Sequence, residues 1–178
     1  DIDDFITAKS DAARLRMFNV SVLITDPFME AVKSGGSWDL LFNGEVYKTV
    51  QARELWDKIM QSTYDYAEPG VIFIDRINNA NNLNYCELIA ATNPCGEQPL
   101  PPYGACLLGS INMARLVSDP FGDSAQLDEA ALSDLVATAV RMMDNVVDAS
   151  KFPLEAQARE AQAKRRIGLG VTGLADAL

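Results

Sequence analysis

Runs of apolar residues divide this chain into short strands and amphipathic helices. Strands are predicted where the run is β-branched and too short for a buried helix, at residues 18–24, 71–74 and 167–171. Helices are predicted where apolar residues recur three or four positions apart, over residues 1–13, 26–33, 51–66, 128–149 and 153–165, and from residue 174. The elements alternate, so the fold class is predicted to be α/β with largely parallel strands.

Several boundaries have a specific chemical reason. Asp26-Pro27 supplies an N-cap and a first-turn proline for a helix. Asn43-Gly44 is a strong turn dipeptide and predicts a hairpin between residues 38–42 and 45–50. In the first helix, Phe5, Ile6 and Leu15 are expected on the buried side. The helix over 128–149 has one continuous apolar stripe, made of Leu132, Leu135, Val136, Ala139, Val140, Met143 and Val147.

Length and composition predict a single domain with a substantial core, since 48% of the 178 residues are hydrophobic. No apolar run is long enough to cross a bilayer, and no signal-peptide pattern is present. The chain has no initiator Met and stops at GLADAL, so we expect an internal piece truncated at both ends. Three cysteines without a paired framework fit a reducing cytoplasm.

Charge and the missing histidines exclude several classes of function. The net charge of −10, without a basic stripe, argues against binding to DNA or RNA polymers. A small phosphorylated ligand is still compatible with it. No histidine is present, so neither a Cys-His nor a Ser-His-Asp nucleophile can be built from this chain. No C-x-x-C pair is present either, so no metal site is expected.

The stretch TNPCGEQPLPPYGACLLGSIN, residues 92–112, concentrates the candidate chemistry. Its four prolines disfavour helix and predict an extended, stiff loop that is not an ordinary central strand. Alternate side chains of an extended chain share a face, so Asn93, Cys95 and Glu97 are expected to point the same way. An amide, a thiol and a carboxylate would then line one sugar-sized ligand.

Cys95 and Cys106 are 11 positions apart and are expected to approach each other if the proline-rich loop folds back. The alternative is two unrelated buried thiols. Against that alternative, a carboxylate two residues from Cys95 opposes formation of a thiolate. The pattern therefore favours a thiol that reacts without first becoming an anion, as in hydrogen-atom transfer by a thiyl radical.

Other motifs are weaker. Residues 168–173 spell G-x-G-x-x-G, but the chain ends before a complete dinucleotide-binding unit, so close strand-to-helix packing is the preferred interpretation. Asn19 and Ser21, at a strand end, are weak candidates for substrate binding. Cys86 is interpreted as a small buried residue without a role. Arg165-Arg166 is interpreted as a charged helix end.

The residues described above resemble the catalytic subunit of ribonucleotide reductase. ATNPCGEQPLPPYGACLLGSIN resembles the finger loop of the adenosylcobalamin-dependent (class II) enzymes nearly letter for letter. The flanking segments RLRMFNVSVLITDPFMEAV, EPGVIFIDRIN and RRIGLGVTGLADAL resemble barrel segments of that family in the same order. The resemblance covers essentially all 178 residues. It implies that residues 1–178 are part of one catalytic domain, a ten-stranded α/β barrel with the finger loop, about residues 92–112, through its centre.

The resemblance also implies roles. Cys95 would be the thiyl radical that takes the 3′ hydrogen of the ribose, and Glu97 the general base for the 3′-hydroxyl. Asn93 would hydrogen-bond the substrate hydroxyls. Cys106 would be one of two thiols that reduce the 2′ carbon and become a redox-active disulfide. Its partner cysteine is expected outside this chain, as are the phosphate-binding segment and the C-terminal cysteines, so the fragment alone should be inactive.

By the same resemblance the cofactor is adenosylcobalamin, the substrate a ribonucleoside di- or triphosphate, and the reductant a thioredoxin- or glutaredoxin-type protein. The product would be a deoxyribonucleotide for DNA synthesis, and a homodimer is one assembly that fits. A class I large subunit, served by a metal-containing partner subunit, is the first alternative. A non-catalytic thiol-containing binding domain and a nicotinamide-type dinucleotide domain are the more distant ones.

Overall fold

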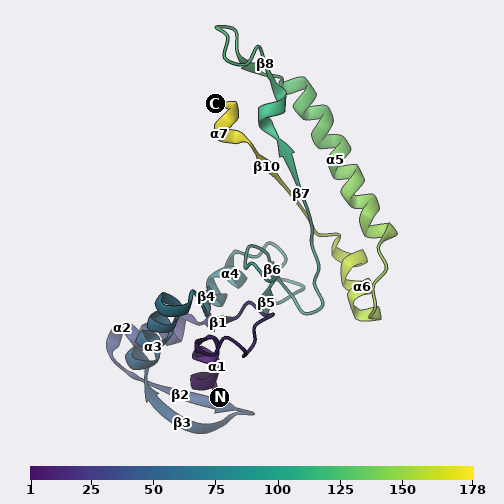
Figure 1. Cartoon of the computed structure of the whole chain (residues 1–178). Helices are drawn as coiled ribbons and strands as arrows, with labels where there is room; N and C mark the ends of the chain where they lie inside the picture. The colour runs from purple at the N-terminus through teal and green to yellow at the C-terminus, as the bar shows by residue number, and fades with distance from the viewer. The chain divides into compact units, whose positions relative to one another are not determined.

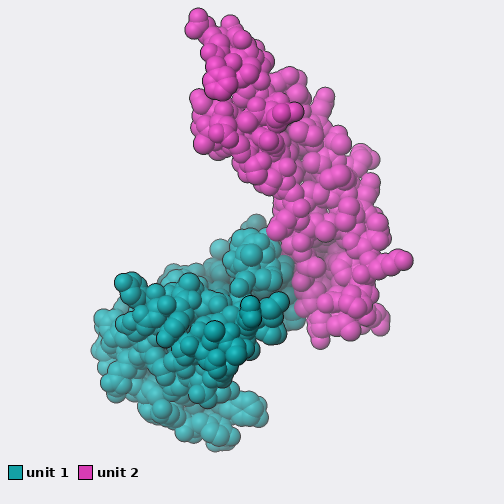
Figure 2. All heavy atoms as spheres, in the orientation of Figure 1, with its two compact units in different colours: residues 1–102 teal, residues 103–178 magenta.

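The structure, a computed structural model, describes all 178 residues. The chain forms two compact units, Asp1–Pro102 and Tyr103–Leu178, which Figure 2 shows in two colours. The boundary falls inside the loop that carries Cys95 and Cys106. The prediction of one catalytic domain over residues 1–178 therefore stays a prediction, and each unit is described by itself.

Unit 1 surrounds one short parallel strand pair. Strands β1 and β4 run parallel, with Ser21 opposite Gly70 and Ile24 opposite Phe73 (Figure 1). In chain order, the elements of this unit are α1 (Ile2–Ile6), a 3₁₀ turn (Ala8–Ser10), β1 (Ser21–Ile24), α2 (Asp26–Ser34), β2 (Ser37–Phe42), β3 (Glu45–Gln51), α3 (Ala52–Tyr66), β4 (Gly70–Phe73), α4 (Ile74–Ala80), β5 (Ala91–Thr92) and β6 (Pro99–Leu100).

The core of unit 1 lies between α1, α2, α3 and β1. The rings of Phe28 and Trp38 meet edge to face, with centroids 5.3 Å apart, which attaches the β2–β3 hairpin to α2. Ser62 Oγ, buried on α3, donates to the carbonyl of Ile6 at 2.8 Å. The buried side chains of this core are Ile6, Ile24, Phe28, Val32, Ala52, Leu55 and Ile59.

The expected elements of unit 1 are present, with local corrections. The first helix ends at Ile6, not near residue 13, and Leu15 is exposed instead of buried. The N-cap of α2 is Thr25, whose Oγ1 accepts from the N–H of Phe28 at 3.3 Å, so Asp26 is the first helical residue. The hairpin turn at Asn43-Gly44 is as predicted, with positive φ at both residues.

Unit 2 is organised by a second parallel pair, β7 with β10, in which Leu107 lies opposite Ile167 and Asn112 opposite Thr172. Figure 1 shows α5 running along this pair. The elements are β7 (Leu107–Asn112), a 3₁₀ turn (Met113–Leu116), β8 (Val117–Ser118), β9 (Gln126–Leu127), α5 (Glu129–Ala149), α6 (Glu155–Lys164), β10 (Ile167–Thr172) and α7 (Leu174–Ala177).

Helix α5 covers the strand pair with one edge of its apolar stripe. Met143 and Val147 are buried, and a Cβ added at Gly109 of β7 would lie 3.1 Å from the sulfur of Met143. The other half of the stripe is open, since Leu135 and Val140 are 42% and 40% exposed. The helix itself is as predicted, and the structure adds a cap by Asp128, whose Oδ1 accepts from the N–H of Ala131 at 2.9 Å.

The fold class is mixed α/β. Each strand pairs with one other strand, in two parallel and three antiparallel pairs, so the sheets do not close into a barrel within this chain. The ten-stranded barrel remains a proposal. None of the helices is both long enough and apolar enough to cross a membrane.

Candidate active site

The Asn93–Gln98 segment is the tip of a small hairpin between β5 and β6. The N–H of Gly96 donates to the carbonyl of Asn93 at 3.0 Å, which closes a four-residue turn, and Gly96 has a φ of +83°. Proline at the second position, asparagine at the first and glycine at the fourth is the preferred composition of a type I turn. The expectation of an extended loop is therefore wrong here. The prolines after residue 98 are compatible with strand β6 because it is a two-residue edge.

The turn brings the side chains of Asn93 and Glu97 into contact. Nδ2 of Asn93 donates to Oε1 of Glu97, and Oδ1 of Asn93 accepts from the N–H of Gln98 at 3.0 Å. The expectation that these two side chains lie on the same side is confirmed. Cys95 lies between them in the turn, and its thiol is free and exposed. An amide, a thiol and a carboxylate thus share one exposed turn.

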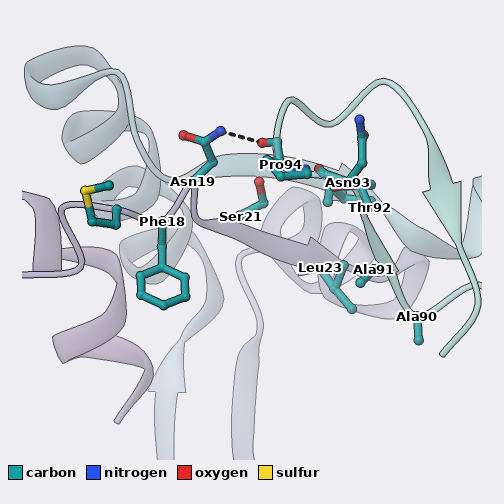
Figure 3. A pocket seen from close by; sticks show the side chains of 11 residues that line it. Phe18, Asn19, Ser21, Leu23, Ala90, Ala91, Thr92, Asn93 and Pro94 are labelled. Carbon is teal, nitrogen blue, oxygen red and sulfur yellow. Dashed lines mark hydrogen bonds between the residues drawn. The ribbon is translucent and has the colours of Figure 1, made fainter. Parts of the chain in front are cut away.

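A cleft of about 510 Å³ lies beside this turn. Figure 3 shows it between the segment that enters β1 and the segment 90–94. The side chain of Asn19 points at the turn, and its Nδ2 donates to the carbonyl oxygen of Pro94 at 2.7 Å. That carbonyl belongs to the peptide bond immediately before Cys95. The residues lining the cleft are Met17, Phe18, Asn19, Ser21, Leu23, Ile72, Ala90, Ala91, Thr92, Asn93 and Pro94.

The two weak candidates, Asn19 and Ser21, therefore lie at the same cleft as Asn93. A Cβ added at Gly70, opposite Ser21 in the β1–β4 pair, would lie 2.9 Å from the serine Oγ, so glycine there leaves room for the hydroxyl. Sequence reasoning missed Phe18 and Thr92 as cleft residues. Period-two alternation from Asn19 and Ser21 points to Leu23 at the cleft and gives no signal for Phe18; the hairpin at 91–100, which places Thr92, had none beyond the Asn-Pro-x-Gly turn.

Cys106 belongs to unit 2, directly before β7. Its thiol is free and half-buried, and burial raises its pKa, while the positive charge of Arg166 acts in the opposite direction. A raised pKa keeps the thiol protonated at neutral pH. Cys95 belongs to unit 1, so the expected approach of the two thiols stays a prediction. Cys86, interpreted from the sequence as buried, is exposed.

The comparison with known families decides the assignment. The family model described as "Ribonucleotide reductase, barrel domain" matches residues 1–178, the whole chain. The chain belongs to the ribonucleotide reductase barrel-domain family. The resemblance drawn from the finger-loop residues is thereby confirmed at the level of the family.

Similar proteins with this domain include vitamin B12-dependent enzymes. The chain is 43% identical over 181 aligned residues to the vitamin B12-dependent ribonucleoside-diphosphate reductase of Mycobacterium tuberculosis, with all of the chain and 25% of that protein covered. It is 42% identical to the protein of that name from Thermoplasma acidophilum, of which it covers 23%. The ribonucleoside-diphosphate reductase subunit alpha of Chlamydia muridarum is 30% identical, with 20% of it covered. The chain thus spans about a quarter of the length of its B12-dependent relatives.

Within the reductase domain, the glycine run at 168–173 has a packing role. A Cβ added at Gly168 would lie 2.9 Å from Cδ2 of Leu108, and one at Gly173 would lie 2.7 Å from Oδ1 of Asn112. Both glycines thus allow β10 and the following turn to approach β7 and its end. Close packing is present at this motif, but it joins β10 to the neighbouring strand β7 and its end, whereas strand-to-helix packing was expected. It leaves the dinucleotide-domain alternative without support.

The residues present suit the cofactor chemistry that the B12-dependent relatives suggest. Cys95 is an exposed, free thiol that directly follows Pro94, a residue of the cleft wall, so its hydrogen would be accessible to an external radical source. No group of three or more His, Cys, Asp or Glu side chains forms a metal-binding cluster in the structure. None of the residues of this chain is assigned to holding the cofactor itself.

Proposed function

We propose that this chain is the central catalytic part of a ribonucleotide reductase, which reduces ribonucleoside di- or triphosphates to 2′-deoxyribonucleotides for DNA synthesis. The observation that carries the proposal is the hydrogen bond between Asn93 and Glu97, which flank the exposed Cys95 in a turn beside a cleft. The amide, the thiol and the carboxylate can then contact one ribose. Free cysteines and the absence of a spanning helix are compatible with the cytoplasmic location that we propose.

In this proposal each of the three residues of the turn has its own role in the first step of the reaction. The thiyl radical of Cys95 takes the 3′ hydrogen atom of the ribose and becomes a thiol again. Glu97 accepts the proton of the 3′-hydroxyl; only its Oε1 accepts from Asn93, so Oε2 remains for the substrate. Asn93 holds the carboxylate in place and hydrogen-bonds the substrate hydroxyls. The loss of the 2′-hydroxyl as water follows.

Cys106 acts in the second half of the reaction. Its thiol and that of a partner cysteine supply two electrons and two protons to the substrate and are oxidised to a disulfide. The raised pKa of Cys106 suits this role, because the group must be a protonated thiol when the substrate is reduced. A dithiol protein of the thioredoxin or glutaredoxin type returns the disulfide to two thiols. A homodimer is the proposed assembly.

The radical source that we propose is adenosylcobalamin, as the names of the relatives at 42–43% identity suggest. When bound, this cofactor supplies the radical that converts the Cys95 thiol into a thiyl. The class I alternative, in which a metal-containing partner subunit supplies the radical, remains open because a relative named subunit alpha is also similar, at 30% identity. Turnover of the full-length protein with adenosylcobalamin and without any second subunit decides between the two.

The first prediction separates the two cysteines in the full-length protein. Cys95→Ser should abolish cleavage of a tritium-labelled 3′ C–H bond, because a serine hydroxyl holds its hydrogen too strongly to become the abstracting radical. Cys106→Ser should still cleave that bond, because Cys95 is intact. The substrate radical then loses water, meets no complete dithiol, and releases free base. Tritium release and free base are measured by scintillation counting and chromatography.

Thr92→Ser, next to Asn93 but with the hydroxyl kept, serves as the control for general disturbance of the turn. Identical behaviour of the two cysteine variants contradicts the separate roles proposed for Cys95 and Cys106. Deoxynucleotide made by Cys95→Ser contradicts the whole proposal.

A further inference from the structure

Cys106 and Arg166 are neighbours across the parallel strand pair of unit 2. The N–H of Leu107 donates to the carbonyl of Arg166 at 3.1 Å, and the next residues, Leu107 and Ile167, are register partners. One step back along both strands, Cys106 lies opposite Arg166. Opposite residues of adjacent strands share a face of the pair, so the thiol and the guanidinium emerge on the same side.

Both side chains line a small cavity of about 60 Å³. Its other walls are neutral and mostly apolar, supplied by Val147, Ser150, Phe152 and Ala161. A Cβ added at Gly168 would lie 3.8 Å from the sulfur of Cys106 and 2.9 Å from Leu108. The glycine therefore allows β10 to lie close against the strand that follows the thiol.

The guanidinium of Arg166 is held from helix α6. Nη1 of Arg166 donates to Oε1 of Glu160 at 3.1 Å, and Nζ of Lys164 contacts the same oxygen at 2.7 Å. The three side chains are 14%, 18% and 16% exposed, so solvent screens them only in part. Arg166 and Lys164 are two cations beside this carboxylate, in a protein whose net charge is −10. The guanidinium of Arg166 is thus a fixed positive charge at the cavity that Cys106 also lines.

We propose that Arg166 is a positioning residue for the redox cycle of Cys106, because its guanidinium, fixed by Glu160, stabilises the sulfur as the leaving thiolate when the disulfide is reduced. A thiolate of a dithiol reductant attacks the partner sulfur of the disulfide, and the S–S bond breaks. Cys106 leaves with the electron pair as a thiolate and then takes a proton from water. The second thiol of the reductant resolves the mixed disulfide. A better leaving thiolate is released faster.

The opposing effects on the thiol fit this cycle. Burial raises the pKa of Cys106 and Arg166 limits the rise. The group is thus a thiol when it reduces substrate, yet it remains able to leave as an anion when the disulfide is cleaved. Arg166 is the charged residue among those that line the cavity, and Glu160 pairs with its guanidinium. The strand and helix α5 contribute only neutral side chains to it.

The redox cycle rests on the proposed function, but the electrostatic coupling is measurable without turnover. In the full-length, reduced protein, the rate of alkylation of Cys106 by iodoacetamide is followed against pH by mass spectrometry of its peptide. Arg166→Gln should lower the rate about 3- to 10-fold at a pH below the pKa of the thiol, because a smaller fraction is thiolate. Arg166→Lys should restore most of it. Arg159→Gln, on helix α6, 75% exposed and paired with Glu155, is the matched control.

An unchanged pH profile in a folded Arg166→Gln protein overturns the proposal. A second measurement needs no variant: the ratio of alkylation by anionic iodoacetate to that by neutral iodoacetamide should be higher at Cys106 than at Cys95, which adjoins Glu97. An equal or lower ratio at Cys106 also overturns it. If the pH profile shifts but no disulfide of Cys106 forms during turnover, the coupling stands and the proposed function is the part that fails.

Discussion

At the scale of single residues, the position of the Cys95 thiol depends on a contact from far away in the sequence. Asn19 donates to the carbonyl of Pro94 across 75 residues, and this carbonyl precedes the peptide nitrogen of Cys95. The hydrogen bonds within the turn fix its shape, whereas this one fixes the turn against the entry of β1. We therefore interpret Asn19, a weak substrate-binding candidate from the sequence, as a residue that positions Cys95.

Loss of the hydrogen bond from Asn19 to Pro94 should reduce turnover far more than stability. Asn19→Ala removes one hydrogen bond, which contributes about 0.5–1.5 kcal/mol to the free energy of unfolding. A displacement of the thiol of about 1 Å can cost up to about 100-fold in rate, so we expect kcat to fall at least about 10-fold. Steady-state kinetics and thermal unfolding of the full-length protein test this. Asn82→Ala, in an exposed turn, is the control, and equal kcat values for the two variants would contradict the interpretation.

The residues of the site could be found from the sequence, but their bonding could not. Asn93, Cys95 and Glu97 are recognisable from the N-P-C-G-E letters alone. Their hydrogen bonds depend on a turn that reverses the chain, and the expectation of an extended loop gave too much weight to the prolines. The hydrogen bond from Asn19 to Pro94 depends on tertiary packing, which no local pattern specifies.

At the scale of elements, periodicity was sufficient where an element is long or has a distinctive turn. The helices α3 and α5 and the Asn43-Gly44 hairpin follow the prediction closely. The first helix is only five residues long, and such a helix depends on packing more than on its own composition. Helix α4 was missed because its residues, IDRINNA, include two asparagines that indicated a loop.

The close approach of β10 to β7 gives a prediction for one glycine with a matched control beside it. Gly168→Ala places a Cβ 2.9 Å from Cδ2 of Leu108, the end of a side chain that is 59% exposed, so this side chain must turn aside, at a cost of about 0.5–1.5 kcal/mol in the free energy of unfolding. Gly170→Ala, two residues along on the same strand, meets only Ser110 Oγ at 3.8 Å and Gly109 O at 4.0 Å, and should change it by less than about 0.5 kcal/mol. Urea unfolding of both variants compares them. Equal destabilisation would show that glycine is not required for close packing at 168.

At the scale of the whole molecule, the surface is strongly acidic and its ion pairs stabilise carboxylates in their charged form. A hydrogen bond from Lys58 lowers the pKa of Asp3, and one from Arg165 lowers the pKa of Asp148. A carboxyl group whose pKa is lower in the folded state contributes its stabilisation above the ordinary carboxyl pKa. That contribution is lost as the pH falls through the lower, folded value.

The protein should therefore lose stability on acidification below about pH 4, even though its net negative charge is then neutralised. Asp148→Asn isolates the part of this pH dependence of stability that comes from Asp148. The difference in the free energy of unfolding between wild type and variant should be largest above about pH 5 and should shrink as the pH falls through the lowered pKa of Asp148. Chemical unfolding at a series of pH values measures it. A difference that does not vary with pH would mean that Arg165 does not hold the carboxylate.

The parallel pairing of β7 with β10 also has a consequence for the order of events during synthesis on the ribosome. Leu107 and its partner Ile167 are separated by α5 and α6, so Cys106 is made long before the strand that carries Arg166 exists. Until that strand has docked, the sulfur is a thiol of an unfinished chain, with neither burial nor a neighbouring cation. The effects of burial and of Arg166 on the Cys106 thiol begin only when the segment that carries Arg166 has docked. The electrostatic environment of Cys106 is therefore completed late in synthesis, and this order follows from the β7–β10 topology.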